Sequence, residues 1–355
     1  MKKSLIALAA LSTIAGSVAA QSTVTISGRI DQSIAAHDAG VANQGKISKV
    51  NSNTYATSRI TLSGVEDLGG GVKAGFFLET GLSPDAGTAG STSTTGQFFS
   101  REANMYISDA KLGELRIGKI TASQTDSDVF VNATTSHVAG MNQALLGKQS
   151  GTAIDGAGDN ANNTIAYTSP TFAGVTLQVF RAAGEDATGL NTDSVNGGSL
   201  RYQAGAFKAV VSQANKRLAG NKDLVQTQYG VNYDFGMIRL GAIRGVYDNT
   251  DTTASDKGTA DVFSVAVPVP ALPKVTVVGA YHKYKNDRGA TWDGKATVVG
   301  ATYDFSKRTA AYVTYAKSTN ESAGNYSVTV TNASGCSATS TPVAVTVNTL
   351  PIASI

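Results

Sequence analysis

The alternation of apolar and polar residues at every second position most limits what this chain can fold into. Between Thr23 and Ile34 the even positions carry mainly apolar residues, and the odd positions carry Thr, Ser, Arg and Asp. A helix would need apolar residues three and four positions apart, and this segment lacks that spacing. The segment is therefore predicted to form a strand with one apolar and one polar face.

The same alternation returns along most of the chain. It is clear in residues 59–64, 72–79 and 103–108. Further predicted strands cover residues 114–120, 163–168, 175–181, 199–204, 207–213, 226–235, 237–244, 261–269, 274–284, 295–304 and 308–317. This makes about fifteen strands, most of them about seven to eleven residues long, as in a barrel that crosses a membrane.

The connections between these strands alternate between short and long. The short ones are 67–71, 109–113, 169–174, 204–206, 234–236, 269–273 and 304–307, and the long ones are 35–57, 81–100, 121–162, 182–198, 214–225, 245–260 and 285–294. A transmembrane barrel has short periplasmic turns and long outer loops, whereas a soluble sandwich has no reason to keep its tight turns at one end. We therefore predict an all-β fold, a closed antiparallel transmembrane barrel without unpaired edges.

Three consecutive glycines, Gly69 to Gly71, stand between two of the predicted strands. A phosphate-binding loop would need a helix directly after them, so that the N–H groups of its first turn could face the anion. Val72, Ala74 and Phe76 follow instead at a spacing of two, which indicates a strand. The glycines are therefore predicted to form a tight periplasmic turn.

The first twenty residues have the form of a secretory signal peptide. Lys2 and Lys3 precede an apolar run from Leu5 to Ile14, and small residues lead up to a predicted cleavage after Ala20. A membrane-anchoring helix is less favoured, because the run is short and no stop-transfer charges follow it. Cys336 is the only cysteine, which excludes an internal disulfide and a thiolate metal cluster.

The remaining composition excludes two further classes of protein. Removal of Lys2 and Lys3 lowers the formal net charge from +3 to +1, so no basic excess remains to cover nucleic acid. No run of about 18 or more apolar residues follows the signal peptide, which excludes an ordinary helical span but not a barrel. No cofactor and no metal site are expected.

Several longer segments together resemble one known family, the general diffusion porins of the Gram-negative outer membrane, and in particular their betaproteobacterial branch. They are VTISGRID (24–31), SRITLSGVEDLGGGVKAGFFLETG (58–81), SREANMYISDAKLGELRIGKI (100–120), NNTIAYTSPTFAGVTLQVF (162–180), YGVNYDFGMIRLGA (229–242) and YDFSKRTAAYVTYA (303–316). The resemblance implies a homotrimer of barrels with about sixteen strands each, surrounded by outer-membrane lipid, whose third outer loop folds inward. It also implies passive diffusion of small hydrophilic solutes and ions.

Three arginines are the leading candidates for a pore constriction. Arg29, Arg59 and Arg101 each have the opposite parity to their apolar neighbours, so they are expected to point into the barrel. By resemblance, the three match wall positions that face the constriction in the family. Lys119 is a further candidate, although the pattern does not fix its orientation.

Acidic residues could face these arginines across the pore. Asp126 and Asp128 lie in the 121–162 connection and would oppose the basic patch if the first part of that loop folds inward. The resulting transverse field would orient polar solutes. The alternative is that all these residues are ordinary solvated charges. Ala166 stands where the family often has a basic residue, which argues for a weaker anion preference than in arginine-rich relatives.

The end of the chain departs from the family pattern. Residues 21–318 are predicted to form the barrel, whereas 319–355 resemble the last hairpin of a bacterial immunoglobulin-like repeat and lack the terminal aromatic residue of the family. Such a domain needs about 100 residues, so the tail cannot form one. We predict that 324–331 pairs with 24–34 as the closing strand, and that 332–355 forms an appended hairpin.

The sequence leaves two alternatives to a channel. A catalytic barrel would have to use His37, His137 or His282, and none of these belongs to a hydrolase or metalloprotease motif. No catalytic residue is therefore predicted. The immunoglobulin-like tail leaves a second alternative, a non-conducting barrel that acts as a surface adhesin.

Overall fold

A computed structural model describes most of the chain beyond the predicted signal peptide, and residues 1–20 lie outside the described part. The described residues are 23–37, 47–89, 97–121, 129–134, 160–184, 192–218, 220, 222–250, 256–287, 293–320, 324–326, 329–331, 337–339, 343–345 and 352–354. None of the helices among them is long and apolar enough to cross a membrane.

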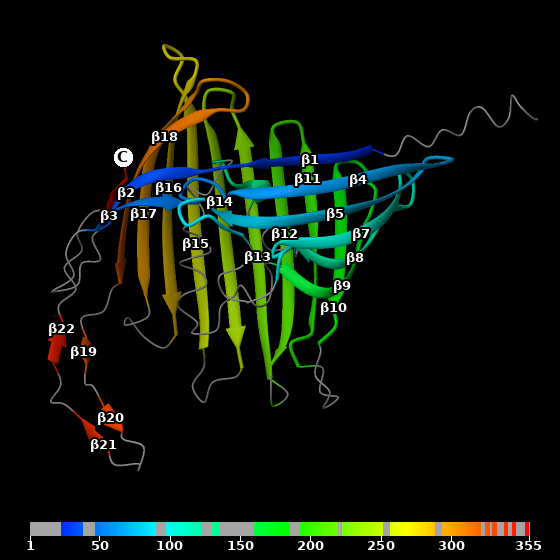
Figure 1. The fold of residues 1–355 in the computed structure, drawn as a ribbon. Coiled ribbons are helices and arrows are strands. Elements are labelled where there is room, and N and C mark those ends of the chain that lie inside the picture. The colour runs from blue at the N-terminus through cyan, green and yellow to red at the C-terminus, as the bar shows by residue number, and fades with distance from the viewer. Residues whose placement is uncertain are drawn as a thin grey trace, which may run out of the picture.

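The fold is dominated by one large antiparallel sheet, in which most strands that follow each other along the chain are neighbours (Figure 1). Its first half contains β1 (Thr23–Arg29), β2 (Gln32–His37), β3 (Ile47–Ser52), β4 (Arg59–Gly69), β5 (Val72–Ser83), β7 (Glu102–Asp109), β8 (Gly113–Thr121) and β9 (Asn160–Thr168), with the two-residue β6 (Thr88–Ala89) paired to β5. Its second half contains β10 (Val175–Ala182), β11 (Val195–Ala204), β12 (Phe207–Leu218), β13 (Lys222–Asp234), β14 (Arg239–Asn249), β15 (Asp256–Pro268), β16 (Val275–Asn286), β17 (Gly294–Asp304) and β18 (Ala310–Asn320).

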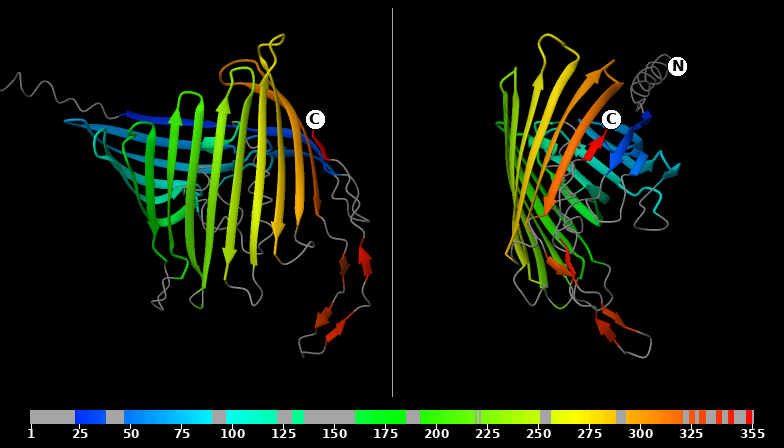
Figure 2. Two further views of the ribbon diagram at one scale, coloured as in Figure 1. Left: turned by 180° about the vertical axis from the view of Figure 1, so that it is seen from behind. Right: turned by 90° about the vertical axis from the view of Figure 1, so that its left-hand side faces the viewer.

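The sheet returns to its beginning through a short strand at the end of the chain, β23 (Ile352–Ser354). This strand pairs with β18 on one side and with β2 on the other, and β2 continues β1 after only two residues. In Figures 1 and 2 the strands of the first half cross those of the second half, as strongly tilted strands do on opposite walls of a barrel. The predicted antiparallel barrel is confirmed.

The segment that completes the sheet is not the predicted one. Residues 324–331 were expected to pair with 24–34, but β19 (Gly324–Tyr326) pairs with β22 (Val343–Val345), and β20 (Thr329–Thr331) pairs with β21 (Ser337–Thr339). The tail thus forms a hairpin with itself. Local pairing closes a much shorter loop than pairing with the first strand, and it therefore costs less chain entropy.

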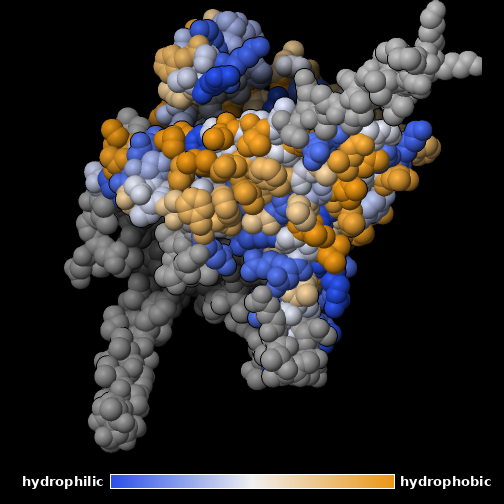
Figure 3. All heavy atoms as spheres, turned by 45° about the vertical axis from the view of Figure 1, so that its right-hand side comes forward, coloured by the Kyte–Doolittle hydropathy of each residue, from blue (hydrophilic) through white to orange (hydrophobic). Residues whose placement is uncertain are grey.

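The outer face of the barrel is apolar, as the alternation predicts. Ile26 and Ile34 are 74% and 66% exposed, and Figure 3 shows hydrophobic residues gathered across the face of the first strands. Near the short turns, outward aromatic side chains lie in contact, and the pairs are Tyr202 with Phe207, Tyr233 with Phe235, and Tyr303 with Phe305. Such a girdle is typical of the level at which a barrel leaves the hydrocarbon.

The triple glycine forms a tight turn between β4 and β5, as predicted. Gly69, Gly70 and Gly71 have φ angles of 82°, 63° and 92°. This left-handed region is open to glycine without the clash that a Cβ atom causes.

Two predicted long connections are wrong. Residues 35–57 were expected to form a connection, but they contain β3, which pairs with β2. Residues 214–225 were expected to form an outer loop, but β12 ends at Leu218 and β13 begins at Lys222. The side chains of Arg217 and Asp223 form an ion pair across the two strands, with Nε and Oδ1 3.0 Å apart. Above the membrane both faces of a strand meet water, so pairing can continue after the apolar alternation has ended.

Candidate pore constriction

Residues 129–134 belong to the long connection between β8 and β9 and lie against the inner wall of the barrel. Val131 and Ala133 are completely buried there. Three hydrogen bonds hold the segment to the wall: Asn232 Nδ2 to Val131 O at 3.1 Å, Ala133 N to Ser264 Oγ at 3.0 Å, and an Arg239 guanidinium nitrogen to Ala133 O at 3.2 Å. This part of the third outer loop therefore folds inward, as the resemblance implied.

Two glycines of the wall make room for this inward segment. A Cβ atom at Gly230 would lie 2.5 Å from Cγ2 of Val131, and one at Gly241 would lie 2.5 Å from the Val131 carbonyl oxygen. Both distances are far below van der Waals contact. The sequence places these glycines inside strands without indicating why, and the structure gives the reason: only residues without a side chain allow the segment this close.

The three predicted arginines, Arg29, Arg59 and Arg101, come together on another part of the inner wall. We call them, together with the neighbouring Glu79, the arginine cluster. Arg29 and Arg59 lie directly opposite each other on β1 and β4. Arg59 Nε is 3.3 Å from Glu79 Oε2, and Arg101 Nε is 2.6 Å from Glu79 Oε1. Arg29 Nε donates a hydrogen bond to the carbonyl oxygen of Thr57, at 2.8 Å.

Glu79 is the centre of this cluster, and the sequence prediction did not include it. It is 3% exposed, and Thr61 Oγ1 donates to its Oε2 at 2.9 Å. The sequence does contain a pattern that indicates this position. Glu79 has the opposite parity to Phe76 and Leu78 on β5, so its side chain must point inward. One carboxylate shared between two guanidinium groups forms strong charge-assisted hydrogen bonds and holds both side chains along the wall.

The cluster keeps a positive charge after these contacts. It contains three guanidinium groups and one carboxylate, and the side chains of Arg59 and Arg101 remain 35% and 24% exposed. Like charges that face each other across two strands, such as Arg29 and Arg59, destabilise a sheet unless something compensates them. Glu79 compensates part of the charge, and the remainder faces the lumen.

The other predicted site residues do not join the cluster. Lys119 lies opposite Ala103, and its Nζ is 3.1 Å from Oε1 of Gln97. Asp126 and Asp128 lie outside the described residues. Ala166 is buried in an apolar cluster of the inner wall that also contains Ile120 and Phe180.

The histidines show no arrangement for catalysis or metal binding in the described part of the chain. His282 is 3% exposed in the wall of β16, His37 is the last residue of β2, and His137 lies outside the described residues. Among the residues described, no group of three or more His, Cys, Asp and Glu side chains could hold a metal ion.

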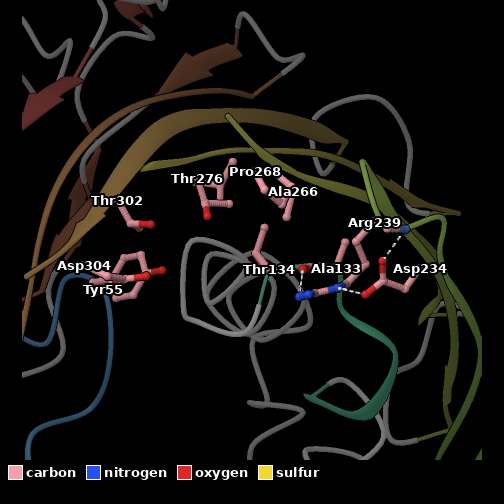
Figure 4. A pocket seen from close by; sticks show the side chains of 12 residues that line it. Tyr55, Ala133, Thr134, Asp234, Arg239, Ala266, Pro268, Thr276, Thr302 and Asp304 are labelled. Carbon is pink, nitrogen blue, oxygen red and sulfur yellow. Dashed lines mark hydrogen bonds and ion pairs between the residues drawn. The ribbon is translucent and has the colours of Figure 1, made fainter. Parts of the chain in front are cut away.

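Below the inward segment, towards the short turns, the lumen contains a cavity of about 270 Å³. In Figure 4, Arg239 and Asp234 lie on one side of this space, and Tyr55, Thr302 and Asp304 lie on the other. Arg239 Nε and Asp234 Oδ2 are 3.2 Å apart. Because hydroxyl groups and charges line it, the space suits water and polar solutes.

Comparisons with known proteins give a consistent result. The sequence profile of the Gram-negative porins matches residues 7–323. Outer membrane porin protein 32 of Delftia acidovorans is 32% identical over 327 residues, which cover 88% of each chain, and major outer membrane protein P.IB of Neisseria gonorrhoeae is 29% identical over 88% of this chain and 92% of its own. The fold matches a solved structure described as the anion-selective porin from Comamonas acidovorans, with a TM-score of 0.75 and 23% identity over 94% of this chain and 98% of that one.

Proposed function

Because the chain belongs to the Gram-negative porin family, we infer that it is a passive diffusion channel of the outer membrane. Small hydrophilic solutes and ions pass through its lumen down their gradients, without an energy source. A barrel with an apolar outer face and a polar, partly obstructed interior suits this role. We further propose that the arginine cluster sets the selectivity of the channel and that the channel works as a homotrimer.

The observation that carries the selectivity proposal is the arginine cluster. Arg29, Arg59 and Arg101 form the basic side of the constriction, and Glu79 fixes two of them along the wall. The charge that remains acts in a narrow space with low-dielectric walls, where the field is strong. The channel therefore prefers anions, in keeping with the description of the similar Comamonas acidovorans structure as anion-selective. The apolar wall at Ala166 keeps this preference moderate.

Two further elements complete the proposal. We propose that Asp126 and Asp128, which lie outside the described residues, oppose the arginines and add a transverse component to the field. Three copies of the chain assemble into a homotrimer, an arrangement named in the description of the similar Vibrio cholerae OmpT structure, trimer form. Lys119, which is bound to Gln97 outside the cluster, contributes less to selectivity than the arginines.

Recordings in a planar lipid bilayer test both the channel function and its anion preference. Stepwise openings with a linear current–voltage relation are expected, and a folded protein that leaves the bilayer silent would contradict the channel. Under a salt gradient the reversal potential should indicate anion preference. The double variant Arg59→Gln/Arg101→Gln should reduce this preference, whereas Arg308→Gln, in an exposed turn, should not. An unchanged reversal potential in the double variant would refute the site and leave the channel intact.

The alternatives have less support. The adhesin alternative depends on residues 319–355. The family match ends at residue 323, so it covers the barrel and gives no support to this alternative. Membership in a family of channels fits the expectation that the chain is not an enzyme. The bilayer recording also separates a channel from an adhesin, because only the channel conducts.

A further inference from the structure

The cavity below the inward segment is lined in part by Thr276, Thr302 and Asp304, whose side chains form no hydrogen bond or ion pair in the described part of the chain. Thr276 and Thr302 lie directly opposite each other on β16 and β17, and Asp304 is the last residue of β17. Thr302 is only 7% exposed, and in Figure 4 its hydroxyl group points into the cavity. A polar group buried to this extent normally has a hydrogen-bond partner, so the cavity offers a place for one.

Among the described charged residues that line the cavity, Asp304 alone lacks an opposite charge beside it. Arg239 donates from Nε to Asp234 Oδ2 at 3.2 Å, and from a second guanidinium nitrogen to the carbonyl oxygen of Ala133 at 3.2 Å. Asp234 also accepts the backbone N–H of Gly236, at 2.8 Å. This ion pair is neutral as a unit, so the described lining keeps one negative charge, at Asp304.

Another part of the lining is apolar. Ala266 and Val278 belong to a buried hydrophobic cluster against which Tyr55 packs, and all three residues line the cavity together with Pro268. The volume of about 270 Å³ is slightly smaller than the roughly 300 Å³ at which sites for drug-sized ligands begin. The cavity therefore suits one small molecule whose C–H groups lie against this apolar part while its polar groups face the free side chains.

We propose that the cavity binds a monosaccharide-sized solute that carries an ammonium group beside several hydroxyl groups, such as an amino sugar. The ammonium group would form a charge-assisted hydrogen bond with Asp304, and the hydroxyl groups would bond to Thr276 and Thr302. A phosphate or carboxylate group fits less well, because Arg239 is already engaged and Asp304 would repel it. A metal ion also fits less well, because one carboxylate and two hydroxyl groups provide few of the strong oxygen ligands that it requires.

The site rests on the proposed channel function but not on its anion preference. The cavity lies on the short-turn side of the inward segment, so a solute that enters between the long connections reaches it after the constriction. A site in a channel has to bind strongly enough to attract the solute and weakly enough to release it. A single carboxylate with two hydroxyl groups meets both conditions. At low concentration the amino sugar should therefore pass faster than a neutral sugar of the same size.

Single-channel recordings with the full-length protein test the site. Glucosamine is added to both sides of the bilayer at about pH 6, where its amine is protonated. Glucose has the hydroxyl groups without the charge, and methylammonium has the charge without the hydroxyl groups, so both serve as comparisons at the same concentration. Glucosamine should interrupt the open-channel current in a concentration-dependent way, and the two comparison solutes should need concentrations about tenfold higher or more for the same effect.

Variants assign the effect to the cavity. Asp304→Asn should weaken the apparent affinity for glucosamine by about tenfold or more, because the charge-assisted contact is lost. Thr302→Val keeps the shape of the side chain and should weaken it by about threefold to tenfold. Asp67→Asn, at the exposed short-turn end of β4, is the matched control and should respond like the wild type. Open-channel steps recorded before the sugar is added show that each variant is folded.

Failure of the site and failure of the channel give different results. A bilayer that stays silent with folded protein would overturn the channel and the site together. Channels that conduct without any interruption by glucosamine would overturn the site alone. An equal effect of glucose or of methylammonium, or an unchanged apparent affinity in Asp304→Asn, would also overturn the site.

Discussion

Tyr312 donates a hydrogen bond from its hydroxyl group to Oδ1 of Asp31 at 2.6 Å, although 281 positions separate the two residues in the chain. Asp31 lies between β1 and β2, and Tyr312 lies on β18, so this bond crosses the seam where the sheet meets its own beginning. The other carboxylate oxygen accepts the N–H groups of Tyr55, at 2.7 Å, and of Ala56. Tyr55 also stacks on Tyr312, with ring centroids 4.8 Å apart. One buried carboxylate thus joins three separate parts of the barrel.

Removal of the seam contact should destabilise the barrel in a graded way. Tyr312→Phe keeps the stacked ring and loses one hydrogen bond to a charged group, so we expect a loss of about 1–3 kcal/mol in the free energy of unfolding. Asp31→Ala should cost more, because it also leaves the N–H groups of Tyr55 and Ala56 without their acceptor. Urea unfolding in lipid vesicles measures both. Equal stability of Asp31→Ala and the wild type would show that the contact does not hold the seam.

Glu79→Gln should change selectivity and stability in opposite directions. The variant removes one negative charge between Arg59 and Arg101, so the anion preference measured as a reversal potential should increase. Loss of the charge-assisted hydrogen bonds should lower the free energy of unfolding by about 1–3 kcal/mol. Glu66→Gln, on the exposed short-turn end of β4, serves as the control. A shift of the variant towards cations would contradict the assigned geometry.

Gly241→Ala should displace the inward segment. The new Cβ atom would lie 2.5 Å from the Val131 carbonyl oxygen and 2.8 Å from the Ala133 nitrogen, and both are backbone atoms that cannot rotate away. We expect a changed single-channel conductance and greater current noise. Gly279→Ala is the matched control, because its nearest neighbour is a side-chain carbon at 3.2 Å. If both variants conduct like the wild type, the segment does not limit the pore.

Deletion of residues 352–355 should weaken the closure of the barrel. The backbone of β23 pairs with three residues of β18 and two of β2, and both strands would lose this partner. We expect a lower unfolding midpoint and unstable currents. Deletion of 329–339, the tip of the tail hairpin, should have little effect, because β20 and β21 pair with each other. A truncated chain as stable as the full one would show that β23 is dispensable.

Much of the fold follows from the sequence because the parity of a strand is a local property. The alternation that places Ile26 outside and Arg29 on the opposite face needs no knowledge of the partner strand. Pairing register, in contrast, decides which inward residues meet. The sequence alone therefore indicated the arginines but did not reveal that Glu79 is shared between two of them.

The remaining differences also have physical causes. The inward segment packs on Gly230 and Gly241 from a part of the chain about 100 positions away, and no local pattern records such a contact. Strand ends beyond the membrane lose their alternation while their ladders continue, so β12 and β13 extend further than predicted. Either 324–331 or 352–354 could be the closing strand. The choice depends on which strand pairing is more stable, and the alternation of residues along the chain does not contain this information.

The path of the sheet also implies an order of assembly. From β4 to β18 each strand pairs with one that is adjacent or nearly adjacent in the chain, so these hairpins can form quickly and independently. The seam of Asp31 and Tyr312 joins the two ends of the barrel and has to wait for the intervening strands. We therefore expect seam formation to be the slow step of folding. Until then β2 and β18 are open edges, and a second unfinished chain could capture them.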